Sequence, residues 1–243
     1  MKKIVYPVLA AFFYLPVIAQ TDANISEDFK QLSGETSRQQ SGFENLQSYS
    51  SGIKGNQFFY PGWTAGSVTT NNNKTIDSRD YVYLFDKVRQ VLFITSSKAQ
   101  VKTQDNVLTA DPDKLKAFTL ITDKPHYFIK ASVYDSGLKN DFFEVLVESD
   151  DYSLLKLTTS TLQKADGHDM LAMKNGNFSD EFVDNIVYYI YHNSKLEKVN
   201  LKEYSLRKTL KEEKTKVDNY FNMHQNDEMS EDLLIGLINY LNK

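Results

Sequence analysis

The apolar residues of this chain change their spacing near residue 202, and this change constrains the fold more than any single motif. Before it, they fall in short stretches rich in tyrosine, phenylalanine and β-branched residues, which pack well in half-buried strands. After it, they recur at helical spacing with lysine and glutamate between them. The order predicts a β-rich α+β fold, in which an antiparallel multi-stranded sheet is followed by a C-terminal helical pair.

Two neighbouring stretches give the clearest predicted hairpin, with strands over residues 142–148 and 152–158 and a turn at 149–151. Because side chains alternate along a strand, Phe143, Val145 and Val147 share one face of the first strand. Short turns between most predicted strands favour antiparallel pairing, and a meander, a sandwich and an open barrel all fit the pattern. The other predicted strands cover residues 66–70, 81–85, 91–95, 99–103, 115–121, 127–131, 185–192 and 195–201.

Residues 202–243 are predicted to form two helices that pack on the same domain as the strands of residues 52–201. The second helix follows Ser230, a good N-cap residue. Gly236 lies inside that helix and is expected to weaken it by about 1 kcal/mol relative to alanine. The first predicted apolar stripe contains Leu206, Leu210, Val217, Tyr220 and Phe221, and the second contains Leu234, Leu237, Ile238 and Leu241.

The first nineteen residues have the three parts of a secretory signal peptide. Lys2 and Lys3 supply the basic start, residues 4–18 are almost wholly apolar, and Ala19 is the small residue before the cleavage point. We therefore expect residues 1–19 to be removed and the mature chain to begin at Gln20. The expected location is the periplasm, the outer membrane surface or the extracellular space. No later segment approaches the length of a transmembrane helix, so no membrane span is expected after signal removal.

Residues 20–51 are dominated by serine, glutamine, glutamate, asparagine and glycine. Such a low density of apolar residues predicts a flexible polar lead, because little burial is available to offset the entropy of ordering. A short helix over residues 26–32 is the alternative at one point of this lead. There Ser26 is a suitable N-cap, and Glu27 and Asp28 suit the first turn.

Charge and cysteine content exclude several classes of protein. The formal net charge is −4 and both signs are interspersed, whereas a nucleic-acid-binding protein would show a basic stripe. The chain has no cysteine, which excludes disulfides, thiolate metal sites and cysteine nucleophiles. It also excludes the cysteine-linked lipid anchor of bacterial lipoproteins. The core has to stabilise the fold unaided.

Four stretches, at residues 54–68, 84–94, 142–156 and 237–242, carry a resemblance to a known group of proteins. Together they resemble exported proteins of Bacteroidota-type Gram-negative bacteria for which no activity is established. The resemblance covers about residues 52–242 and concerns structural patterning. It implies export and one intact domain, and it carries over no functional residue.

Neither a catalytic nor a metal-binding motif is recognised, and no cofactor is expected. The four histidines, His126, His168, His192 and His224, have no metal-ligand spacing. His168 has Asp166 and Asp169 close by in sequence, which suits either a metal or general-base role or a solvated loop histidine. The solvated loop histidine is favoured, because no second ligand has the spacing of a metal site. Glu144 and Glu148 share one face of a predicted strand. We interpret them as solvated charges, because glycosidase carboxylates converge across a cleft.

An aromatic cluster beside Pro61 and Gly62 supplies the candidate binding residues Phe59, Tyr60 and Trp63. Exposed rings there would form a platform for a glycan or a protein partner, since aromatic residues are enriched at interaction hot spots. The alternative is that the rings fill one end of the core.

The function favoured by the sequence is that of a non-enzymatic exported envelope or surface protein, acting as an interaction or structural module. Its expected partner is an envelope protein or a glycan, and not a nucleic acid. A small-ligand or glycan-binding module is the alternative, and a hydrolase is the least favoured.

Overall fold

The computed structural model describes Phe29, Leu32, Ser33 and residues 53–103, 106–139, 141–165 and 179–243. The predicted signal peptide, most of the predicted polar lead, and His168 lie outside the described residues. Eight antiparallel strands form the main sheet in the order β11-β10-β9-β8-β7-β6-β1-β2. They are β1 (Ala65–Thr70), β2 (Thr75–Asp77), β6 (Leu115–Ile121), β7 (Pro125–Lys130), β8 (Phe142–Val147), β9 (Ser153–Gln163), β10 (Glu181–His192) and β11 (Lys195–Val199).

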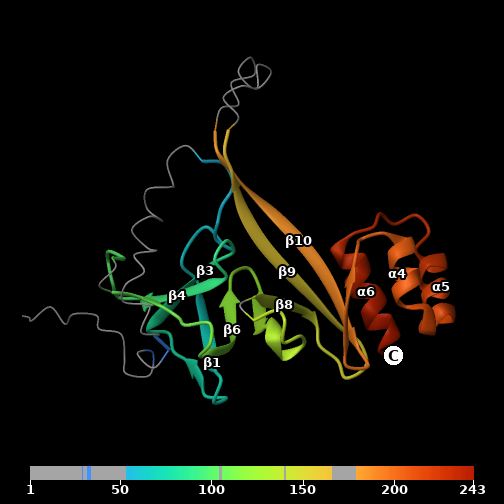
Figure 1. The fold of residues 1–243 in the computed structure, drawn as a ribbon, viewed down its shortest axis with the longest axis horizontal. Coiled ribbons are helices and arrows are strands. Elements are labelled where there is room, and N and C mark those ends of the chain that lie inside the picture. The colour runs from blue at the N-terminus through green and yellow to red at the C-terminus, as the bar shows by residue number, and fades with distance from the viewer. Residues whose placement is uncertain (1–28, 30–31, 34–52, 104–105, 140, 166–178) are drawn as a thin grey trace, which may run out of the picture.

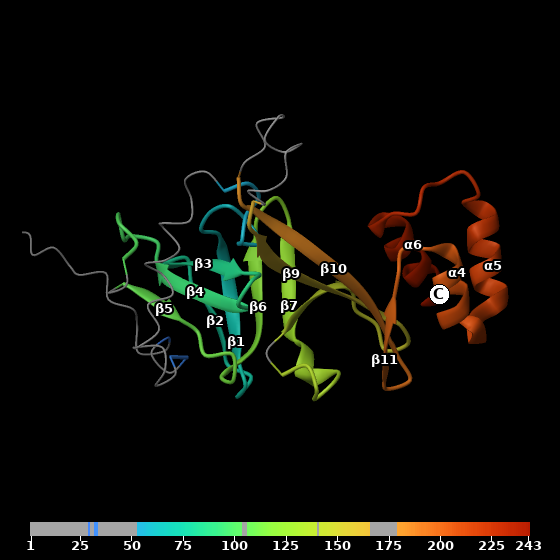
Figure 2. The same cartoon turned by 45° about the horizontal axis from the view of Figure 1, so that its top comes forward.

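A second, three-stranded sheet lies at one end of the molecule (Figure 2). Its strands are β3 (Tyr81–Asp86), β4 (Val91–Ser96) and β5 (Val107–Thr109), in the order β3-β4-β5. Phe85 of β3 packs against Phe118 and Phe128 of the main sheet, and Tyr83 belongs to the same core. Phe29, from the predicted polar lead, is fully buried in this cluster, as is Leu32. This part of the lead is therefore docked on the domain.

Three helices occupy the other end of the molecule (Figure 1). They are α4 (Glu203–Thr209), α5 (Lys214–Met223) and α6 (Glu231–Leu241), with the 3-10 turn η3 (Lys211–Glu213) between α4 and α5. Their apolar stripes form a second core with residues of β8 to β11, among them Leu154, Tyr188 and Ile190. The helices and the small sheet cover the same face of the main sheet, since the row Phe118–Phe128–Glu144–Lys156–Tyr188 connects their two cores.

The opposite face of the main sheet carries a third core. Ile129, Phe143, Leu155 and Leu157 alternate with the residues of the first face, as strand geometry requires. The 3-10 turn η2 (Ala131–Val133) leads into a segment whose Tyr134 packs on this core. This face therefore has a partial cover from the chain itself.

The β-rich class with C-terminal helices is confirmed, and the strands form a large meander with a smaller sheet packed against it. β9 and β10 are longer than expected and extend as a two-stranded arm beyond β8 (Figure 1). Among the helices of the described residues, none is long and apolar enough to cross a membrane.

The strand predicted at residues 99–103 is wrong, because the third strand of the small sheet is β5. Backbone groups in this region form hydrogen bonds with nearby side chains instead of with a neighbouring strand. The Lys102 ammonium donates to the Ser96 carbonyl at 3.0 Å, and the Asn106 amide donates to the Val101 carbonyl at 2.8 Å. The side-chain Oδ1 of Asn106 also accepts from the Thr103 backbone N–H.

The first predicted helix is divided into α4 and α5 rather than continuous. Leu210 leaves the helical region, with ψ near 32°, and η3 follows it. No apolar residue lies between Leu210 and Val217, whereas Leu206, Leu210 and Val217 are all buried. The break lets both halves of the stripe reach the same core.

Candidate functional site

The predicted aromatic cluster does not form one platform. The Phe59 ring lies edge-on to His126 and Phe128, with centroid distances of 4.9 and 5.0 Å. Trp63 packs instead with Leu84 and Phe93. Because Leu84 and Phe85 alternate along β3, Phe59 and Trp63 lie against opposite faces of that strand. Tyr60 is the exposed member, at 46%.

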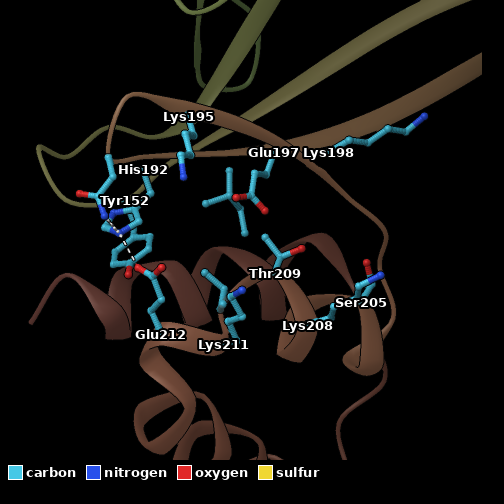
Figure 3. A pocket seen from close by; sticks show the side chains of 13 residues that line it. Tyr152, His192, Lys195, Glu197, Lys198, Ser205, Lys208, Thr209, Lys211 and Glu212 are labelled. Carbon is cyan, nitrogen blue, oxygen red and sulfur yellow. Dashed lines mark hydrogen bonds and ion pairs between the residues drawn. The ribbon is translucent and has the colours of Figure 1, made fainter.

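A pocket of about 500 Å³ lies at the other end of the molecule, between the β10–β11 hairpin and the α4–η3 segment (Figure 3). The hairpin turns at Asn193 and Ser194, whose positive φ values of 49° and 59° match a turn that follows strand twist. Leu206 and Leu210 anchor the opposite wall in the helical core. Both walls are therefore held by elements of regular structure.

The inner wall of the pocket is a stacked pair of rings. The Tyr152 and His192 rings are 3.9 Å apart between centroids and nearly parallel, at 13°. Asn242, at the end of the chain, accepts from the Tyr152 N–H and donates to the Tyr152 carbonyl, both at 3.0 Å. These two bonds imitate a strand ladder and fix the backbone beneath the rings. Burial first, and then Glu213, Glu212 and Asp151, raise the pKa of Tyr152 to about 12, so its phenol stays neutral.

Both nitrogens of His192 are engaged. Nδ1 lies 2.7 Å from the Asp151 carbonyl, which only accepts, so Nδ1 carries the proton. Nε2 then accepts from the Asn193 amide at 2.7 Å. The Glu212 carboxylate is 4.0 Å from Nε2, which is too far for a hydrogen bond but close enough for an electrostatic interaction. The ring is thus a fixed part of the wall and is not free to act as a base.

Lysines are the commonest charged residues of the pocket lining. Lys195 and Lys198 come from β11, Lys208 from α4 and Lys211 from η3, and Glu197 and Glu212 are the two acids. Lys195 and Glu197 point toward the helices, and Thr209 and Lys211 lie across from them, whereas Lys198 points away (Figure 3). In the part of the chain that the structure describes, none of the four lysines forms an ion pair. The pocket presents unneutralised positive charge.

A second polar cluster crosses the main sheet between its two cores. His126 Nδ1 lies 2.6 Å from Glu144, whose other oxygen is 2.7 Å from the Lys156 ammonium. Lys156 also pairs with Glu231 at 3.1 Å, and the Tyr188 hydroxyl donates to Glu231 at 2.9 Å. The members of this row satisfy one another, and the Glu144 side chain is only 6% exposed. We assign the row a structural role.

Neither polar site is predicted by the sequence pattern. Glu144 was interpreted as a solvated charge, and this is wrong, because the two layers on the sheet bury it. The pocket joins Tyr152, the β10–β11 turn and η3, which are far apart in sequence. The available signal was the density of lysine after residue 194, which was interpreted only as the polar side of a helix.

Within the described residues, no three histidine, aspartate or glutamate side chains gather in a way that would hold a metal ion. In comparisons with protein-family models, curated proteins and solved structures, no match to this chain was found. The features that bear on function are therefore the pocket and the predicted signal peptide of residues 1–19.

Proposed function

We propose that the protein is an exported, non-enzymatic interaction module of the cell envelope, and that its pocket receives a polar group of a ligand or partner. The single observation that carries the proposal is the pocket itself. Its volume of about 500 Å³ falls in the range of small-molecule sites, and its walls are mostly polar. A stacked ring pair and a hairpin of fixed geometry preorganise it, which lowers the entropic cost of binding.

The pocket supports binding better than hydrolysis. A hydrolytic nucleophile needs a base within hydrogen-bond reach, and both nitrogens of His192 are already bonded. The Ser205 hydroxyl accepts from the Asn200 N–H at 3.2 Å and serves to hold the start of α4. His192 and Ser205 therefore have structural partners rather than a catalytic arrangement.

Two features support the proposed export, namely the predicted signal peptide of residues 1–19 and the resemblance to exported Bacteroidota-type proteins. Mass spectrometry of the protein recovered from the envelope fraction of its native cells tests it, and the expected N-terminal residue is Gln20. Ala19→Arg, which removes the small residue at the cleavage point, should leave the leader attached. A wild-type chain that keeps Met1 and stays in the cytoplasm would overturn export.

Photocrosslinking in those cells tests the pocket. Benzoylphenylalanine replaces Lys211, which lines the pocket, or Met223, which is 63% exposed on α5 outside it. The expected result is a discrete adduct from position 211 and none from position 223. Thr209→Phe in the same chain fills the pocket and should abolish the adduct. Equal labelling from both positions, or labelling that Thr209→Phe leaves unchanged, would exclude the pocket as the interaction site.

The aromatic residues Phe59, Tyr60 and Trp63 stay a second candidate, because Tyr60 is exposed. A glycan bound there would change the fluorescence of Trp63, the single tryptophan of the chain. With the pocket as the site, a bound ligand leaves this fluorescence unchanged, since Trp63 packs with the small sheet at the other end of the molecule.

A further inference from the structure

The charge of this protein is distributed unevenly along the chain. The whole sequence has a net charge of −4, whereas residues 195–216 contain eight lysines and arginines and four glutamates. That segment is β11, α4, η3 and the start of α5, and β11, α4 and η3 form two walls of the pocket. The pocket therefore lies in a basic part of an otherwise acidic molecule.

The basic residues of this segment differ in their partners according to position. Away from the pocket, Arg207 pairs with Glu203 and Asp218, and Lys214 also pairs with Asp218. Among the residues that the structure describes, no carboxylate pairs with the pocket lysines Lys195 and Lys211. Unpaired cations that face a preformed cavity favour an anionic occupant, because the cavity walls reduce solvent screening.

The remaining lining matches hydroxyl groups and a ring. Glu197 and Thr209 point into the same space as Lys195 and offer oxygen acceptors for hydroxyl donors (Figure 3). The stacked face of Tyr152 and His192 offers a flat wall. A bare anion would use only the lysines, whereas a hydroxylated ring that carries an anionic group would use all three features.

We propose that the pocket binds an acidic carbohydrate, a sugar ring that carries a carboxylate or phosphate group. This inference rests on the proposed function of the pocket as an interaction site. The anionic group lies between Lys195 and Lys211, and the ring hydroxyls face Glu197 and Thr209. Carboxylate and phosphate share the recognition chemistry, and the probes below distinguish them.

Calorimetric titration of the purified mature chain tests the proposal. The probes are glucuronate, glucose 6-phosphate, glucose and inorganic phosphate. One or both acidic sugars should bind, and glucose should bind at least about tenfold more weakly, which corresponds to one strong charge-assisted contact. The affinity for the acidic sugar should fall as sodium chloride is raised, because salt screens the lysines. The acidic sugar that binds more tightly identifies the anionic group.

Matched lysine variants give the control. Lys195→Gln with Lys211→Gln should raise the Kd for the acidic sugar by about tenfold or more, since both cations are removed while polar side chains remain. Lys202→Gln removes one charge from the same segment, at an exposed position outside the pocket lining, and should leave the Kd within about twofold. Circular dichroism of each variant verifies that the fold is retained.

The outcomes separate this inference from the function on which it rests. Glucose that binds as tightly as the acidic sugars overturns the anionic ligand but leaves the pocket as a binding site. Phosphate that binds as tightly as glucose 6-phosphate overturns recognition of the ring. Failure of every probe, with a pocket-specific photocrosslink still formed, overturns the acidic carbohydrate alone. Failure of the photocrosslink as well overturns the proposed function.

Discussion

At the scale of single residues, Glu144 and Lys156 form a buried ion pair on the main sheet. They form directly opposed partners on β8 and β9, with exposed side-chain fractions of 6% and 14%. Burial lowers the pKa of Lys156, but the carboxylates of Glu144 and Glu231 outweigh burial and raise the pKa above its ordinary value. Removing one member leaves its partner as an uncompensated charge in a poorly hydrated place.

Lys156→Met is therefore expected to lower the free energy of unfolding by about 3 kcal/mol, the cost typical of breaking a buried ion pair. Urea denaturation measured by circular dichroism gives this value. The combined change Lys156→Met with Glu144→Met removes both charges, and it should destabilise less than the single change does. Lys98→Met is the exposed control: its pair with Asp80 has side chains 75% and 61% exposed. That control should leave the free energy of unfolding nearly unchanged, because the exposed pair is screened by solvent.

A Lys156→Met variant as stable as the control would show that the row is not energetically coupled. At this scale the sequence places Phe143 and Val145 on one strand face correctly, but its placement of Val147 on that face is wrong. Val147 packs in the core under the helices, because the register of β8 against β9 shifts between Val145 and Val147. Strand alternation also places Glu144 with Phe142 on the other face. It does not predict that both are covered, because the cover comes from the small sheet and from α6. Those layers depend on contacts between distant segments, which alternation along one strand does not contain.

At the scale of the elements, the interface between α5 and α6 requires a glycine, although glycine has a low helix propensity. Gly236 faces α5, and a Cβ at this position would overlap with the Tyr220 hydroxyl. That hydroxyl donates to the Leu233 carbonyl at 3.1 Å. The glycine therefore lets α5 approach α6 closely. Helix propensity alone predicts only that Gly236 weakens α6.

Gly236→Ala is expected to lower stability by about 1–3 kcal/mol, because overpacking outweighs the gain of about 1 kcal/mol in helix propensity. Urea denaturation again measures it. Asn239→Ala, at an exposed position of the same helix, is the control for propensity and should be neutral or slightly stabilising. Tyr220→Phe removes the overlapping oxygen, so Gly236→Ala should cost less in that background than in the wild type. If the two costs are equal, the overlap with Tyr220 is not the cause.

The helical elements also show where local pattern suffices and where it does not. The N-cap of α6 is confirmed, with the Ser230 hydroxyl accepting from the Leu233 N–H at 3.2 Å. The break at Leu210 is not predicted by the sequence, because the helical spacing of the apolar residues can be followed from Leu210 to Val217 without interruption. The break places Lys211 and Glu212 at the pocket, so the missed feature of the fold is also the one that builds the site.

At the scale of the whole molecule, the chain distributes its apolar residues over several packed cores instead of one. The small sheet, the partly covered opposite face and the helices each enclose a cluster. Turn residues and strand composition are local, so the sequence predicts the type and approximate place of most elements, although it misses the short strands β2 and β5. The order of the layers depends on which faces meet, and the pattern of one strand is compatible with a sandwich as well as with this arrangement. The pocket at the junction of layers could not be predicted for the same reason.

Buried tyrosines in all of these cores couple the stability of the whole molecule to alkaline pH. Burial raises the pKa of Tyr134 to about 12, and burial also raises the pKa values of Tyr83 and Tyr188 above 10.0. Between pH 10 and the folded pKa, the unfolded chain loses these protons and the folded chain keeps them. Stability is therefore lost as the pH rises through this window. Lys156, whose pKa is also raised, acts in the same direction, since its stabilising charge is lost above its folded pKa.

The expected result is a free energy of unfolding that falls steadily from about pH 9.5 to about pH 12. Urea denaturation at each pH measures this fall, and absorbance at the tyrosinate band reports ionisation in the same samples. Tyr134→Phe removes one buried phenol and should make the fall less steep. Tyr204→Phe, at a position 80% exposed, should leave the slope unchanged. If the buried phenols instead ionise near pH 10 while the chain stays folded, the cores are more open to water than this packing allows.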